Sequence, residues 1–172
     1  MKSVLLLLVV ACATLQGFSQ EDKSKRPSPP ASVQATLRNG TIVSIDYSQP
    51  SVKGRTIGKD VEPMKGKVWR TGANEATVFE INKDARVEGK HLAAGKYALF
   101  TIAGDTEWVL IFNKDWKQWG AFNYKEKEDA LRVKVKPSKV RTFAEKMTFT
   151  VDKKGNVKLF WGDVQVGFNV SG

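Results

Sequence analysis

Cysteine and histidine are nearly absent from this 172-residue chain, which has one of each, Cys12 and His91. Cys12 lies in an N-terminal segment that we expect to be removed, so the mature chain has no disulfide, thiol nucleophile or cysteine metal ligand. A single histidine excludes multi-histidine metal sites and leaves a Ser-His-Asp triad only one possible base. We therefore expect no metal site and no cofactor, and a core that is stable without cross-links.

Long apolar runs are also lacking. The N-terminal run, residues 4–10, is too short to cross a bilayer as a helix. It follows a short positive start and precedes small residues, Gly17 and Ser19, at positions −3 and −1 before Gln20. This layout is typical of a secretory signal peptide over residues 1–19. The sequence thus predicts an exported protein, periplasmic or secreted, with no transmembrane segment in the mature chain.

A second interpretation of the same segment is a lipoprotein signal. Residues 9–12 resemble a lipobox, in which Cys12 would become the acylated first residue of the mature chain. Only eleven residues precede this cysteine, which leaves an apolar region at the short end of the usual range. Cleavage before Gln20 is therefore the preferred prediction.

The charge is strongly positive: 28 lysines and arginines face 18 aspartates and glutamates, for a formal net charge of +10. The basic residues are mostly lysines scattered along the chain, whereas nucleic-acid-binding proteins tend to cluster arginines on one face. We expect no nucleic-acid partner. The charge instead favours solubility and a weak attraction to anionic surfaces of the cell envelope.

Composition divides the mature chain into a tether and a single domain. Residues 20–30 are charged and rich in proline, with almost nothing to bury, which predicts a flexible tether. The following residues, 31–170, suffice for one self-sufficient core and are too few for two.

Short runs of alternating apolar and polar residues, separated by turns, predict strands. The clearest pair, residues 32–38 and 41–47, flanks Asn39-Gly40, which is a strong signal for a β-hairpin with a type I′ turn. Residues 48–67 break the pattern and predict a long irregular connection. Further strands are expected at residues 76–81, 85–88, 96–103, 107–113, 131–136, 147–152, 157–161 and 164–170.

Tyr97 indicates the type of β-fold. It opens an apolar strand after Leu92 and a turn at Gly95, in the manner of the tyrosine corner of Greek-key sandwiches. At most one or two short helical turns are expected, around residues 125–130. The sequence therefore predicts an all-β, antiparallel Greek-key β-sandwich with long irregular loops.

The segment most unlike a plain strand is residues 68–77. Its polar members Arg70, Thr71, Asn74 and Glu75 surround a glycine turn just before a strand begins. Polar groups at the mouth of a strand commonly form ligand sites. A structural alternative is a buried ion pair between Arg70 and Glu75 that ties the long connection to the sandwich. Both interpretations stay open at this point.

Two further residues extend that candidate site. Asp46 lies near the end of a predicted strand and Arg55 lies in the long connection that follows, so they would add a second wall. Asp46 with Glu75 would also supply the pair of carboxylates that a small hydrolase needs. The separation of such a pair cannot be read from a sequence.

A second unusual segment, residues 115–124, carries Trp116, Trp119 and Asn123. Two tryptophans three residues apart in a loop seldom both point into one core, and exposed indoles near amides offer stacking surfaces for sugars and peptides. The structural alternative is a small apolar cluster that closes one end of the sandwich.

Residues 46–55, 68–77, 93–102 and 119–124, in this order, resemble the domain-of-unknown-function family numbered 2911. The resemblance covers residues 28–168, and its tryptophan-arginine-threonine-glycine-alanine-asparagine-glutamate block is specific. The family comprises mostly exported proteins of Bacteroidetes-type bacteria, so the resemblance agrees with export. It implies no activity, because the family has none assigned to it.

We expect a binding or interaction module at the cell envelope, with a glycan or a peptide as its ligand. The alternatives are a small carboxylate-dependent hydrolase and a purely structural envelope protein. A hydrolase would gather Asp46, Glu75 and Arg70 in one cleft, whereas a binding module would expose the loop of Trp116 and Trp119 as a platform.

Overall fold

The computed structural model describes residues 22–172. The expected signal peptide, its cleavage site before Gln20 and the alternative acylation site at Cys12 lie outside the described residues. The described part consists mainly of antiparallel strands in two sheets, with two single-turn 3-10 helices, η1 (Lys23–Lys25) and η2 (Glu126–Glu128). This confirms the predicted all-β class. Within residues 22–172, no helix has the length and apolar character needed to span a membrane.

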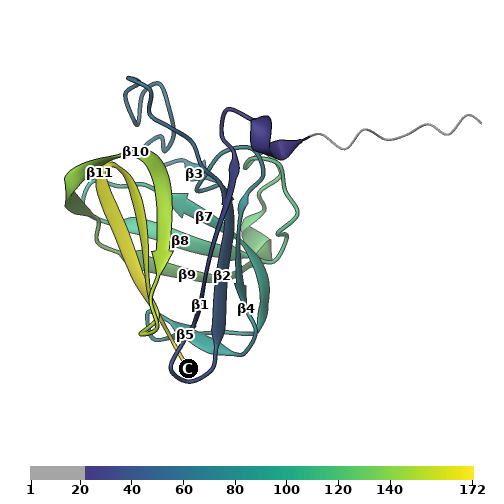
Figure 1. Ribbon diagram of the computed structural model, residues 1–172. Coiled ribbons are helices and arrows are strands. Elements are labelled where there is room, and N and C mark those ends of the chain that lie inside the picture. Colours follow the sequence, from purple (N-terminus) through teal and green to yellow (C-terminus); the bar gives the residue numbers. More distant parts are fainter. Residues whose placement is uncertain (1–21) are drawn as a thin grey trace, which may run out of the picture.

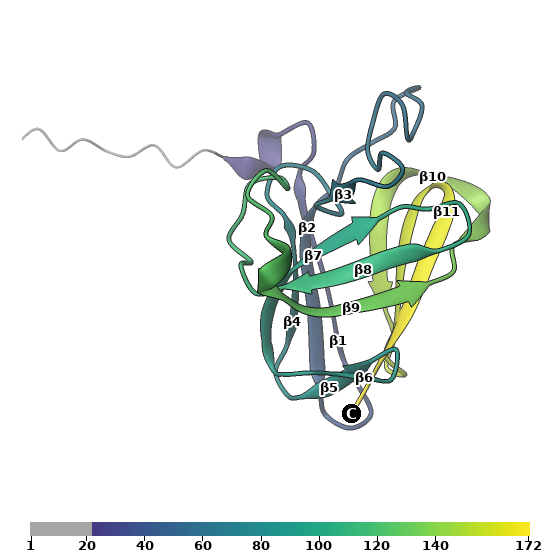
Figure 2. The same ribbon diagram turned by 180° about the vertical axis from the view of Figure 1, so that it is seen from behind.

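The larger sheet has seven strands, in the order β1-β2-β4-β7-β8-β9, with the short β3 paired to β7. Figure 2 shows β7, β8 and β9 side by side, and the registers of these antiparallel pairs agree with the picture. The strands are β1 (Pro30–Thr36), β2 (Ile42–Ser48), β3 (Val68–Trp69), β4 (Thr77–Ile81), β7 (Gly95–Ile102), β8 (Trp108–Asn113) and β9 (Asp129–Val135).

The smaller sheet has four strands in the order β10-β11-β5-β6. They are β10 (Ser138–Val151), β11 (Asn156–Ser171), β5 (Ala85–Val87) and β6 (Lys90–Leu92). The β5–β6 hairpin comes between β4 and β7 in the sequence, so the chain crosses from one sheet to the other and back. Two antiparallel sheets that do not close into a barrel form a β-sandwich, which confirms the predicted fold (Figure 1).

The core lies between the two sheets. Phe79 and Phe112 of the larger sheet and Phe168 of the smaller one form an aromatic cluster, with ring centroids 5.0 to 6.1 Å apart. Trp69 and Trp161 are also almost completely buried. Burying each such large side chain contributes about 1.5–3 kcal/mol, which explains how the described domain is held together without disulfides.

Two local predictions meet different outcomes. The Tyr97 hydroxyl donates a hydrogen bond to the Ala93 carbonyl, 2.9 Å away, which confirms the tyrosine corner. The β1–β2 hairpin also forms, but its turn is not type I′, because Gly40 has a positive φ of 79° and Asn39 does not. The Gly40 N–H donates to the Leu37 carbonyl (2.9 Å). The loop is therefore longer than two residues, and only its glycine position needs the left-handed conformation.

The C-terminal strands differ most from the prediction. β10 starts at Ser138, well before the expected start, and the strands expected at residues 157–161 and 164–170 form one strand that bends at Gly162. The first half of β10 is an edge strand with mostly exposed side chains, so it lacks the apolar alternation that marks a half-buried strand. β3 and β6 are too short to show any period. The expected helical region, residues 125–130, contains η2.

Candidate functional site

A cleft of about 470 Å³ opens beside β2 and β4. Four parts of the chain that are far apart in sequence line it: the segment up to the start of β1, the end of β2, the start of β4 with the two residues before it, and the loop between β8 and η2. We call it the aromatic cleft, because Tyr47, Trp116 and Trp119 are among its lining residues. The other lining residues are Lys23, Arg26, Pro30, Asp46, Ser48, Glu75, Ala76, Val78, Lys117 and Gln118. This volume lies in the range of small-ligand sites.

The loop at residues 114–125, which we call the tryptophan loop, is paired with the predicted polar segment. An isolated antiparallel bridge joins Glu75 to Trp119, and the Gly120 N–H donates to the Asn74 carbonyl (3.0 Å). Asn74 adopts a left-handed φ of 56°, which asparagine tolerates better than most residues. The polar segment therefore positions the tryptophan loop at the edge of the cleft.

The two tryptophans of this loop have different environments. Trp116 packs against a second, smaller apolar cluster that includes Phe100, and the ammonium groups of Lys96 and Lys117 lie 5.3 and 5.0 Å from the centre of its ring. Trp119 is 54% exposed. Trp116 thus fits the alternative of a small apolar cluster, whereas Trp119 fits the alternative of an exposed stacking surface.

The Glu75 carboxylate binds two cations from the N-terminal segment. Lys23 Nζ lies 2.9 Å from Oε1, and Arg26 Nη1 donates to both carboxylate oxygens at 3.0 Å. Burial by itself raises the pKa of Glu75. Hydrogen bonds from Lys23, from the backbone of Glu75 and from Arg26 outweigh that effect and lower the pKa to about 2. The Arg26 guanidinium also lies 5.7 Å from the ring centre of Trp119, in cation–π range.

The sequence does not predict the contribution of Lys23 and Arg26, because residues 20–30 have the composition of a flexible tether. Lys23 and Arg26 contact the domain through Glu75, and the Asn74 side chain adds a hydrogen bond to the Ser28 carbonyl (3.0 Å). No local pattern pairs an arginine with a carboxylate 49 positions later in the chain. The flexibility of the tether stays a prediction.

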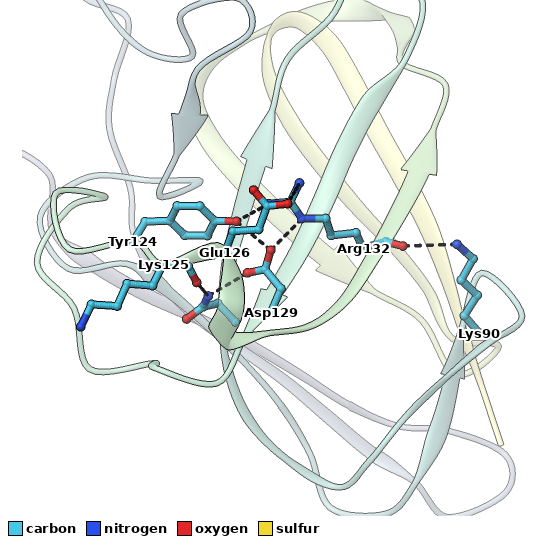
Figure 3. A network of polar contacts seen from close by, with 7 residues as sticks. Lys90, Tyr124, Lys125, Glu126, Asp129 and Arg132 are labelled. Carbon is cyan, nitrogen blue, oxygen red and sulfur yellow. Dashed lines mark hydrogen bonds and ion pairs between the residues drawn. The ribbon is translucent and has the colours of Figure 1, made fainter.

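A polar network anchors the far end of the tryptophan loop (Figure 3). Asp129 accepts hydrogen bonds from the Tyr124 hydroxyl (2.7 Å), Arg132 Nε (2.6 Å) and Asn113 Nδ2 (2.7 Å). The Asp129 side chain is only 8% exposed, so these donors replace water. Burial first, and then the hydrogen bond to Asp129, raise the pKa of Tyr124 to about 12, which keeps its hydroxyl a donor. Asn113 also donates to the Lys125 carbonyl (3.0 Å), so the loop is tied to β8 and β9.

Four predicted site residues line the aromatic cleft: Asp46, Glu75, Trp116 and Trp119. The structure therefore brings one residue of the expected second wall, one of the polar segment and both tryptophans to one place. Tyr47 and the other apolar lining residues are not among the predicted site residues, because in the sequence an apolar strand residue is indistinguishable from a core residue.

Arg70 and Thr71 lie outside the lining of the cleft. Thr71 is buried and its hydroxyl hydrogen-bonds the Thr101 hydroxyl (3.2 Å). Burial lowers the pKa of Arg70, partly offset by Glu62, and its Nε has no hydrogen-bond partner among the described residues. The alternative ion pair between Arg70 and Glu75 is not among the ion pairs of the described part of the chain, because Glu75 pairs with the N-terminal segment instead.

Arg55 and Asn123 do not line the cleft either. Arg55 donates to the carbonyls of Ser51 (2.7 Å) and Val52 (3.1 Å), inside the long connection. Asn123 is exposed on the tryptophan loop. Both residues belong to the expected segments but are not part of the cleft lining.

Within residues 22–172, no group of three or more histidine, cysteine, aspartate or glutamate side chains is placed to hold a metal ion.

Comparison with known proteins identifies the family. Neither the curated proteins nor the solved structures include a match to the chain. The sequence pattern of the family described as "Protein of unknown function (DUF2911)" matches residues 28–170, which span both sheets and nearly all of the aromatic cleft. The chain therefore belongs to the DUF2911 family of proteins of unknown function.

Proposed function

We propose that this chain is an exported binding module whose aromatic cleft takes a glycan. The observation that carries the proposal is the half-exposed indole of Trp119 at a 470 Å³ cleft that Tyr47 and Trp116 also line. A large exposed aromatic side chain costs solvation free energy until a ligand covers it. The apolar C–H face of a sugar ring is suited to cover an indole in this way.

Polar groups around the indole match the rest of a sugar. Asp46 is exposed on the lining of the cleft and offers a carboxylate acceptor to sugar hydroxyls. Lys117 lines the same cleft and supplies a donor. Stacking surface and hydrogen-bonding groups of both kinds thus lie within one cavity, which supports a glycan ligand.

A peptide ligand is less well supported. The strands β2 and β4 that line the cleft are each paired on both sides, so they offer no free edge to which a peptide strand could add. The edge strand β1 contributes only Pro30, which has no N–H to donate.

Binding is also better supported than hydrolysis. Asp46 and Glu75 both line the cleft, as a carboxylate-dependent hydrolase would require. However, a general acid needs a pKa near the working pH, whereas the pKa of Glu75 is lowered to about 2. Both oxygens of Glu75 also accept hydrogen bonds from Arg26, so this carboxylate serves to hold the N-terminal segment.

Trp119→Ala tests the glycan site, with Phe122→Ala as the matched control. Phe122 is 84% exposed on the same loop and does not line the cleft. The mature chain, residues 20–172, is screened on a glycan array and the hits are titrated by calorimetry. We expect Trp119→Ala to weaken binding by roughly tenfold or more and to lower the melting temperature by no more than about 4 °C through loss of the cation–π contact with Arg26, and Phe122→Ala to bind normally. No glycan hit, or equal losses in both variants, would contradict the proposal.

Export is tested separately. Mass spectrometry of the protein from its native cells is expected to show an N-terminus at Gln20. An acylated N-terminus at Cys12 would establish the lipoprotein alternative instead, and an intact Met1 would contradict export.

A further inference from the structure

The smaller sheet carries a second concave surface. It lies between residues 138–150 of β10 and the β11 residues Phe160 and Gln165, and has a volume of about 790 Å³. We call it the basic groove. Its described lining residues are all different from those of the aromatic cleft, so a ligand bound there is independent of the proposed glycan site.

A bend in the β10–β11 hairpin forms the groove. The pairing shifts register on both sides of Ala144, which lies opposite Gly162, and irregular pairing of this kind bends a strand. Gly162 has a φ of 63°, and a Cβ at this position would lie 2.4 Å from Cδ1 of Ile57. Figure 1 shows β10 curving over at this end of the molecule. Glycine therefore permits both the bend and the close packing of the long connection against it.

The groove is lined by cations that form no ion pair with any residue of the described chain. Lys139, Arg141 and Lys146 line it, and none of its described lining residues is acidic. Lys158 adds a fourth positive charge on the same face, because it pairs with the lining residue Thr150 across the hairpin. None of these four cations takes part in an ion pair with another described residue.

The carboxylate of β10 that lies nearest to these cations in the chain accepts a hydrogen bond from the long connection. Glu145 follows Ala144 in the chain, and its Oε1 accepts a hydrogen bond from the Lys53 N–H at 2.7 Å. On the larger sheet, by contrast, the exposed Lys134 lies 2.8 Å from Glu107. Like charges gathered on one face repel each other, and an anion that binds there relieves the repulsion. The unpaired cations therefore favour a ligand with several negative charges.

The neutral lining of the groove narrows the class of ligand. Ser138, Thr142 and Thr150 contribute hydroxyl groups and Gln165 contributes an amide, all of which can donate to and accept from sugar hydroxyls. We propose that the basic groove binds an anionic polysaccharide, a chain of sugars that carry carboxylate or sulfate groups. A flexible polymer can follow a concave surface, whereas a bilayer presents a plane. The exposed Phe143, which a membrane-binding face would use as an anchor, does not line the groove.

The binding test uses the mature chain, residues 20–172, with three polymers. Polygalacturonate carries carboxylates, dextran sulfate carries sulfates, and unmodified dextran is the uncharged control. We expect calorimetry to show tighter binding to the two anionic polymers than to dextran, whose uncharged sugars could occupy only the proposed glycan site. The affinity falls as salt is added, because exposed charges are screened beyond about 10 Å at 0.1 M ionic strength. Equal binding to dextran that Trp119→Ala does not weaken, or no binding to either anionic polymer, would overturn the proposal.

Two variants with the same change in net charge locate the site. The groove variant combines Lys139→Gln, Arg141→Gln and Lys146→Gln. The control variant changes three exposed lysines elsewhere on the surface, Lys59→Gln, Lys83→Gln and Lys127→Gln. We expect the groove variant to lose roughly tenfold or more in affinity and the control variant about twofold or less. Equal losses would mean attraction to the net charge alone and would overturn the assignment.

Two further measurements keep the test decisive. If the groove variant does not fold, amide chemical shifts of the wild-type chain with polygalacturonate decide: changes confined to β10 and β11 support the groove, and changes elsewhere overturn it. Vesicles of phosphatidylglycerol are added as a competitor, and tighter binding to these than to either polymer would assign the groove to a membrane surface. Trp119→Ala is expected to leave polymer binding unchanged, which separates this result from the glycan site.

Discussion

The aromatic cleft and the basic groove place positive charge in opposite ways. In the cleft, Lys23 and Arg26 are bound to Glu75, and the cations serve to join segments that are distant in the chain. In the groove, the cations come from one hairpin and are unpaired among the described residues. Paired charge at a site built from four segments stabilises its shape, whereas charge on one bent hairpin that has no partner among the described residues is available to a ligand.

The largest effect on stability is expected at the Asp129 network, which anchors the tryptophan loop of the cleft. In Asp129→Ala, Tyr124, Arg132 and Asn113 lose their shared acceptor, so the free energy of unfolding should fall by about 2–4 kcal/mol. Urea unfolding measures it, with Asp163→Ala, an exposed carboxylate, as the control. Cleft binding should weaken while groove binding stays intact. A loss no larger than that of the control would show that the network does not anchor the tryptophan loop.

The next effect tests the bend of the groove. Gly162→Ala places a Cβ against Ile57 in a backbone region that alanine disfavours, which should cost about 1–3 kcal/mol. Gly167→Ala, in the same strand, is the control, because its Cβ would meet only ordinary contacts at 3.6 Å and beyond. Adding Ile57→Val removes the clashing Cδ1 and should recover the steric part of the loss. If Gly162→Ala is as stable as Gly167→Ala in urea, the bend does not depend on glycine.

A smaller effect is expected from the charge pair of the cleft. Glu75→Gln keeps the size of the side chain and removes its charge, which should cost about 0.5–1 kcal/mol near neutral pH, the range of a partly exposed pair. The folded pKa of about 2 lies below the ordinary value of 4.5. The stability from this pair is therefore complete above pH 4.5 and is lost as the pH falls toward 2.

Melting temperatures across this pH range provide the measurement. Above pH 4.5 the wild-type chain should melt at a higher temperature than Glu75→Gln, and this difference in melting temperature should shrink as the pH falls to about 2. High salt should reduce the difference as well, because the Glu75 side chain is 39% exposed. A constant difference at every pH would mean that the charge of Glu75 does not hold the N-terminal segment.

The smallest effect on stability is expected in the groove itself. The variant with Lys139→Gln, Arg141→Gln and Lys146→Gln removes no ion pair of the described residues, so its free energy of unfolding should change by no more than about 0.5 kcal/mol. Any change should be an increase at low salt, because like-charge repulsion is relieved. Urea unfolding at low and high salt checks this. A clear destabilisation would show that these cations support the fold and are not held for a ligand.

Local patterns predict the parts of the fold that depend on neighbours in sequence. The alternation at residues 32–38 and 41–47 becomes β1 and β2, and Tyr97 finds its acceptor only four residues away. The first half of β10 is not predicted by such patterns, because an edge strand exposed on both faces need not alternate apolar and polar residues. The bend at Gly162 escapes it as well, since a glycine between two apolar runs also fits a turn between two strands.

The sequence predicts which individual residues contribute to the candidate site, but not which of them lie together in space. Glu75, Asp46 and the two tryptophans stand out in the sequence because polar or aromatic residues interrupt strand patterns there. The partner of Glu75 does not stand out in the sequence. Arg70 is near Glu75 in the chain, yet Glu75 pairs with Arg26, which is 49 positions away. Ion pairs form between side chains that the fold brings within a few ångströms, and sequence distance sets no such limit.

The sequence alone determined an all-β sandwich, its tyrosine corner and the segments from which a site could be built, because each depends on period-two burial or on turn chemistry within a few residues. Tertiary structure alone decided that the segment before β1 closes the aromatic cleft and that Trp116 packs while Trp119 stays exposed. It also decided that three cations of β10 line one concave surface, with Lys158 of β11 on the same face of the hairpin. These features depend on register, bends and long-range pairing, whose energies arise only once distant segments meet.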